Sequence, residues 1–226
     1  NNFRDLGTHL NLTQAANGST LTARMYRATR MAKHLAWMPI TLAEKEKVIR
    51  ANILPLALYG CEAAHISSNV FQQLRSTIAR IIGPNSAKCS IDLVFEMSSS
   101  SFDLDPESYV IYQRIAAIRR IVAKHQGYQT IVSNMIMEYI SNPETINDAK
   151  GPVGMLVHQL NQMGYGVGAD FVICKLHEPS IDMLDMPWQH LKRAVYDMCA
   201  RHRTLRVNQT RTFLGIVPEL DSNMIK

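Results

Sequence analysis

Four cations recur at every third position near the start of the chain: Arg24, Arg27, Arg30 and Lys33. Guanidinium and ammonium groups bind phosphate oxygens, and a row of them gives salt-dependent binding that is independent of nucleotide sequence. In a helix, a three-residue step winds such a row slowly around the axis, which suits contacts that follow phosphates along a groove. The alternative is a solvated outer face with no ligand.

The net charge of the chain lies in the same segment. The 226 residues include 24 Lys and Arg against 19 Asp and Glu, a formal net charge of +5. Residues 1–60 contain eight of the basic and three of the acidic side chains, so this segment holds the whole excess. Such an uneven distribution favours a polyanionic partner. The secondary candidates for phosphate contacts are Lys45, Lys47 and Arg50.

Two Cys-x-x-His pairs offer the ligands of a zinc site, Cys174 with His177 and Cys199 with His202. Two such pairs can form a tetrahedral Cys2His2 centre. However, His202 falls on the apolar face of a predicted helix, and Cys174 lies in a β-like run, where cysteine packs as a small hydrophobe. We therefore expect no metal here and keep zinc as the alternative.

No motif predicts catalysis by this segment. The sequence lacks Gly-x-Ser-x-Gly, His-Glu-x-x-His and the Gly-Lys-Ser/Thr of phosphate loops. The glycine-rich run at 164–168 follows a predicted helix and is expected to end it. Asp103 and Asp105 precede Pro106, as helix-capping residues do.

The elements that must position the basic row are helices. Apolar residues recur at spacings of four, three, four and three, at Leu21, Met25, Ala28, Ala32 and Leu35. This seam predicts a helix from Ser19 or Thr20 to Trp37, ended by Pro39. Thr41 and Glu44 predict a capping box that opens a second helix, which Pro55 should kink or end early.

The remaining chain predicts short β segments and further helices. Residues 3–12 alternate apolar and polar side chains and predict one strand whose partners lie elsewhere. Residues 85–104 are polar and serine-rich, with a short apolar island at 93–95, and predict a loop or subdomain boundary. The helix from Pro187 contains Arg201, Arg203 and Arg206, which acidic residues in the preceding loop can neutralise.

These patterns predict a mainly α protein: a helical bundle with a short N-terminal β element (1–84) and a helical C-terminal extension (85–226). The chain begins at Asn1 rather than Met, so we expect a fragment. Four scattered cysteines, the lack of a signal peptide and an apolar run too short to span a bilayer indicate an intracellular protein, nuclear or cytoplasmic, without a membrane partner.

Three motifs resemble the stretch that follows the palm in reverse transcriptases of non-LTR (LINE-type) retrotransposons. They are a Phe-x-x-Leu-Gly strand, a helix with a Leu-x-x-Arg start, and a helix ending in Leu-Pro-x-x-Leu-Tyr-Gly-x-Glu. Their residues here are Phe3, Leu6 and Gly7; Leu21 and Arg24; and Leu54, Pro55, Leu58, Tyr59, Gly60 and Glu62. The resemblance is specific over residues 3–62 and loose beyond them.

This resemblance implies the thumb and post-thumb region of an RNA-directed DNA polymerase, a helical part that holds an RNA–DNA or DNA duplex. Leu6 and Gly7 would shape the strand near the primer. The Tyr/Phe-x-Asp-Asp motif that binds the catalytic metals is not in the sequence, so Mg²⁺ and catalysis are expected in an upstream palm domain of the same polyprotein. The alternatives are a helical structural or protein-interaction module and, third, a helical enzyme with an unrecognised site.

Overall fold

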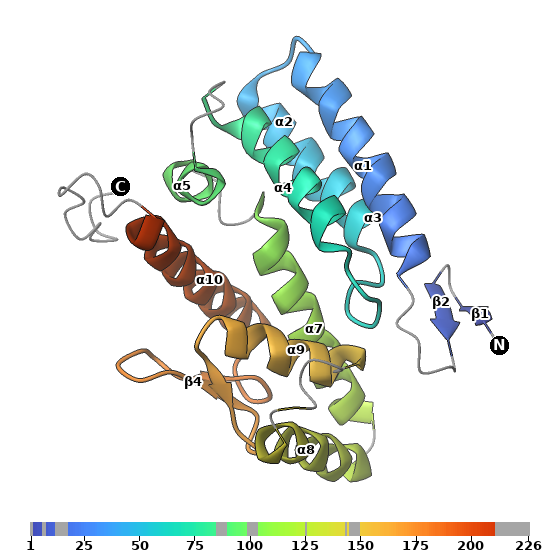
Figure 1. The fold of residues 1–226 in the computed structure, drawn as a ribbon, viewed down its shortest axis with the longest axis vertical. Coiled ribbons are helices and arrows are strands. Elements are labelled where there is room, and N and C mark those ends of the chain that lie inside the picture. The colour runs from blue at the N-terminus through green and yellow to red at the C-terminus, as the bar shows by residue number, and fades with distance from the viewer. Residues whose placement is uncertain are drawn as a thin grey trace.

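The protein is mainly helical, with a small three-stranded antiparallel sheet and an N-terminal hairpin (Figure 1). The computed structural model describes residues 2–5, 8–11, 18–84, 90–98, 104–124, 126–142, 144 and 150–210. Within these residues, no helix combines the length and the apolar character needed to cross a bilayer.

The elements follow one another along the chain with short connections. The helices are α1 (Ser19–Trp37), α2 (Leu42–Val48), the π-helix η1 (Ile49–Ile53), α3 (Leu54–Leu58), α4 (Ser68–Ile82), α5 (Ile91–Met97), α7 (Pro106–Lys124), α8 (Gln126–Ser141), α9 (Gly151–Gln162) and α10 (Trp188–Thr210). The strands are β1 (Asn2–Asp5), β2 (Thr8–Asn11), β3 (Gly166–Val167), β4 (Val172–Cys174) and β5 (Ile181–Asp182).

The N-terminal β element is a hairpin rather than one strand. Strands β1 and β2 pair antiparallel, with Phe3 opposite Leu10. The prediction that this segment pairs with strands elsewhere was therefore wrong, because its two halves satisfy each other's backbone groups. Leu6 and Gly7, the predicted primer-proximal residues, lie outside the described part of the chain.

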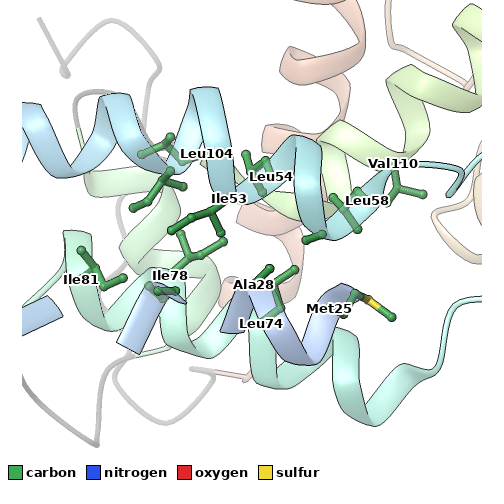
Figure 2. Packing of buried hydrophobic residues seen from close by; sticks show 14 of the residues in the cluster. Met25, Ala28, Ile53, Leu54, Leu58, Leu74, Ile78, Ile81, Leu104 and Val110 are labelled. Carbon is green, nitrogen blue, oxygen red and sulfur yellow. The ribbon is translucent and has the colours of Figure 1, made fainter. Parts of the chain in front are cut away.

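Helix α1 has the predicted bounds and the predicted seam. The five apolar residues spaced four and three apart are all buried, none more than 3% exposed. They pack against α3 and α4, and Figure 2 shows side chains of the three helices directed into one shared interior, among them Met25, Leu58 and Leu74. One side of α1 is thus committed to the core, and the other is left for solvent or a ligand.

The capping box at the start of α2 is confirmed. The Thr41 hydroxyl accepts a hydrogen bond from the Glu44 backbone N–H at 3.3 Å, and the Glu44 carboxylate accepts one from the Thr41 N–H at 2.8 Å. The bond from the Thr41 hydroxyl to this carboxylate lowers the pKa of Glu44 first of all, with smaller contributions from the Thr41 N–H and Lys47. The first turn of α2 is therefore fixed by its own side chains.

Replacing Thr41 with Ala should lower the free energy of unfolding by about 1 kcal/mol, because the substitution removes the acceptor for an orphan helix N–H. Urea denaturation followed by circular dichroism measures the change. Thr130→Ala, at an exposed position inside α8, is the matched control and should be neutral or slightly stabilising. Equal midpoints for the two variants would contradict a stabilising role for the cap.

Pro55 changes the winding of its helix instead of ending it. The helical segment continues from Leu42 to Leu58, with one π-helical turn over Ile49–Ile53 whose last bond runs from the Leu54 N–H to the Ile49 carbonyl. Proline lacks an N–H, and in an α-helix its ring crowds the carbonyl four residues earlier. A π-helical turn contains one residue more than an α-helical turn. This wider turn lies just before Pro55, and α3 follows it directly.

The predicted loop at 85–104 contains a helix. The apolar island forms α5, in which Val94 and Phe95 are buried. Helix α5 contacts α4 and α10, and Gly83 lies so close to Val94 that a Cβ at this glycine would come within 2.5 Å of it. The loop prediction was wrong here because a seven-residue helix has too few turns to show a periodic pattern.

The buried hydrophobic residues form two clusters that meet in α7. The first runs from Leu21 to Val110 and the second from Ile111 to Cys199, where α7, α8, α9, α10 and the small sheet pack together. Arg114, on α7, is buried against α9, where its Nη1 donates to Gln159 Oε1 at 2.6 Å. The sequence-based division between residues 84 and 85 stays a prediction.

A group of buried and partly buried charges, the ionic cluster, joins α4, α5, α7 and α10. Its members are Arg75, Asp92, Glu96, Asp105, Glu107, Arg203 and Arg206. At its centre, the fully buried Asp105 accepts from Arg75 Nε at 3.0 Å and also from Arg203 Nη1. Asp105 also accepts from the Glu107 N–H at 3.0 Å, which confirms its predicted role at the start of α7.

Candidate nucleic-acid interface

Three of the four predicted cations on α1 project into solvent. Arg27, Arg30 and Lys33, here called the α1 cations, are exposed on the side opposite the buried seam. Helix α1 contains no Asp or Glu in its nineteen residues. Among the residues that the structure describes, no acidic side chain forms an ion pair with them. Their positive charge is therefore available to a partner.

Arg24, the fourth cation, is half-buried and bonded within the protein. Its Nη1 donates to the Tyr59 carbonyl oxygen at 2.9 Å, and its guanidinium lies 4.9 Å from the centre of the Tyr59 ring. Gly60 follows with a φ of +84°, a left-handed conformation that glycine adopts without strain. Two motifs from distant parts of the sequence thus meet here, and Arg24 joins the start of α1 to the end of α3.

Of the three secondary cations, one is bonded within the protein, as Arg24 is, and two are exposed. Lys45 is half-buried, and its Nζ donates to the Ala36 carbonyl oxygen at 2.9 Å, which satisfies an acceptor in the last turn of α1. Lys47 and Arg50 are exposed. Two of the seven cations singled out in the sequence therefore make internal contacts, and five remain directed to solvent.

The second basic helix, α10, directs Arg203 and Arg206 into the protein. Arg203 donates from Nε to Glu96 at 2.6 Å, and Arg206 donates to Asp92 at 2.9 Å and Glu107 at 2.8 Å. These partners lie in α5 and α7, not in the loop before α10.

Of the expected loop acids, Glu178 pairs with Arg201 at 2.7 Å, which confirms that part of the prediction. Burial would raise the pKa of Glu178, but bonds from Tyr165, Lys175 and Arg201 more than offset it and hold the pKa at about 2. Arg201, Arg203 and Arg206 are therefore paired with acids inside the fold, and α1 is the better candidate for a polyanion.

Sequence reasoning missed two aromatic residues on the outer side of α1. Tyr26 and Trp37 have exposed fractions of 49% and 90%. The spacing of four, three and four through Tyr26, Arg30, Lys33 and Trp37 places all four on one side of the helix. The signal is present in the sequence, because Tyr26 and Trp37 continue the helical spacing of Arg30 and Lys33.

The four possible zinc ligands do not come together. Cys174 is exposed on β4 and Cys199 is buried in α10, where burial raises the pKa of its thiol to about 12. His202 is half-buried, and its pKa is lowered, first by burial and then by Arg206. Across the described ranges, no group of three or more His, Cys, Asp or Glu side chains could hold a metal ion.

Comparisons with protein-family models, with curated proteins and with solved structures found no match to this chain.

Proposed function

We propose that this chain holds a nucleic-acid duplex, RNA–DNA or DNA, by contacts between the α1 cations and backbone phosphates. It would serve as the thumb and post-thumb part of a LINE-type reverse transcriptase whose palm is a separate domain. The observation that carries the proposal is a solvent-facing helix side with three cations, no acidic residue and no ion-pair partner in the described chain.

Two further observations support this function. Helix α1 is held firmly from behind by its buried seam and by Arg24, so the α1 cations stand on a rigid element. In addition, the packing of Arg24 on Tyr59 gives a physical reason for the Leu-x-x-Arg and Leu-Tyr-Gly motifs to occur together. No catalytic step is assigned to this chain, because the metal-binding carboxylates belong to the proposed palm.

The test is a salt titration of duplex binding, measured by fluorescence anisotropy with a labelled RNA–DNA hybrid and a DNA duplex of the same sequence. Each phosphate contact contributes about 0.9 to the slope of log affinity against log salt concentration. Three contacts predict a fall in affinity of about 40-fold between roughly 50 and 200 mM salt. The double variant Arg27→Ala/Arg30→Ala should reduce the slope by about 1.8.

The matched control is Lys124→Ala/Arg193→Ala, which removes two exposed charges from α7 and α10. This control should leave the slope unchanged. Absent or salt-independent binding would reject the proposal and favour the alternative, a helical structural or protein-interaction module. An equal loss in both double variants would mean that total charge acts and that α1 is not the interface.

A further inference from the structure

The turn between α1 and α2 presents an apolar surface to solvent. Trp37 is 90% exposed, and Met38, Ile40 and Leu42 beside it are also exposed. The turn lies at the top of Figure 1, at the opposite end of the molecule from α8. Exposing an indole ring so fully is unfavourable in water unless a ligand covers it. This turn therefore needs an explanation beyond phosphate binding.

The exposed tryptophan continues the outer side of α1. Tyr26, Arg30, Lys33 and Trp37 lie within about 60° of one another around the helix axis, opposite the buried seam. At a rise of 1.5 Å per residue, they extend over about 16 Å. Two aromatic side chains thus stand at the two ends of a pair of cations along one line, a combination of ring faces and positive charge that surfaces binding unpaired nucleic acid also present.

We infer that Trp37 stacks on an unpaired nucleobase beyond the end of the duplex, so that a duplex with a single-stranded extension is the preferred ligand. This inference rests on the proposed function and adds the kind of nucleic acid to it. Within a duplex, neighbouring base pairs cover the base faces, and a side chain can stack only on an unpaired base or at a duplex end. The α1 cations would hold the adjoining phosphates.

Charge decides between this ligand and an apolar protein partner. An apolar partner would cover Trp37 and Leu42 but would leave Arg30 and Lys33 without a counter-charge. A nucleic acid offers an aromatic face and a phosphate for each nucleotide, so it matches both kinds of side chain. The absence of Asp and Glu from α1 fits the same ligand, since a carboxylate on this helix would repel phosphates.

The experiment compares a blunt duplex with the same duplex carrying a single-stranded extension, using the full chain. Trp37 and Trp188 are its two tryptophans, so Trp188→Phe leaves Trp37 as the reporter. We expect the extended duplex to quench Trp37 fluorescence and to bind about tenfold more tightly than the blunt one. Trp37→Ala should abolish this preference, and Trp37→Phe should retain most of it.

Leu42→Ala is the matched control, because it removes an exposed apolar side chain from the same turn without removing a ring. Equal affinity for the two ligands, or no quenching, overturns the inference. So does self-association in sedimentation that Trp37→Ala and Leu42→Ala both abolish, since the turn would then be a protein contact.

Failure of this inference and failure of the proposed function give different results. If both ligands bind equally and the affinity depends on Arg27 and Arg30, the duplex function stands and only base stacking is rejected. If neither ligand binds at any salt concentration, both are rejected.

Discussion

Replacing Asp105 with Asn should lower the free energy of unfolding by about 3–5 kcal/mol. Asp105 is fully buried and is shared by the Arg75 and Arg203 guanidiniums, each buried as well. Removing the carboxylate charge leaves two buried cations with less compensation, which costs far more than the loss of a surface ion pair. Asparagine keeps the shape and the oxygen that accepts from the Glu107 N–H, but its amide nitrogen replaces Oδ2, so the variant removes the charge together with the acceptor for Arg203.

Urea denaturation measures this change, and Glu138→Gln is the matched control. Glu138 is exposed on α8, and its substitution should shift stability by less than about 0.5 kcal/mol. If Asp105→Asn unfolds at the same urea concentration as the control, the ionic cluster contributes nothing to stability.

The same carboxylate predicts the response to acid. Burial alone would raise the pKa of Asp105, but Arg75 and Arg203 more than offset it and hold the pKa at about 2. The unfolded value is about 3.9, so the stabilisation is present above about pH 4 and is lost as the pH falls towards 2. Glu96 acts in the opposite sense, because its burial raises its pKa. Stability measured over this range should therefore depend less on pH in Asp105→Asn than in the wild type.

Features set by local chemistry were predictable from the sequence. The bounds of α1, the capping box at Thr41 and the start of α7 at Asp105–Pro106 depend on residues within a few positions of each other. The partners of Arg203 and Arg206 were not predictable, because they lie about a hundred residues earlier and periodicity carries no information on them. Arg114 shows the same limit, since it is buried by α9, whose Gln159 lies 45 residues later in the chain.

The candidate interface was predicted in outline but not in detail. A three-residue step rotates by about 60° from one cation to the next, so Arg24 falls at the edge of the seam while Arg30 falls opposite it. This geometry explains why Arg24 bonds to Tyr59 while Arg27, Arg30 and Lys33 remain in solvent. The contact of Lys45 with Ala36 depends on how the α1–α2 turn folds, which sequence spacing does not reveal.

Replacing Phe95 with Ala should lower the free energy of unfolding by about 3–5 kcal/mol, because the ring is fully buried in the first cluster. Met97→Ala on the same helix is the matched control: its side chain is 71% exposed, and we expect a change below about 0.5 kcal/mol. Equal stabilities for these two variants would mean that α5 is a dispensable loop, as the polar composition of 85–104 indicated.

A double-variant cycle tests why α5 matters. The Phe95 ring lies 5.5 Å from the Arg75 guanidinium, and Asp105 accepts a bond from the same arginine. Phe95 and Asp105 therefore share Arg75, and neighbouring residues of this kind couple by about 0.5–3 kcal/mol. Phe95→Ala combined with Asp105→Asn should thus cost less than the sum of the single changes. Strict additivity would mean that the apolar packing of α5 and the ionic cluster stabilise the fold independently. Coupling would mean that α5 connects α4 to α10 through both.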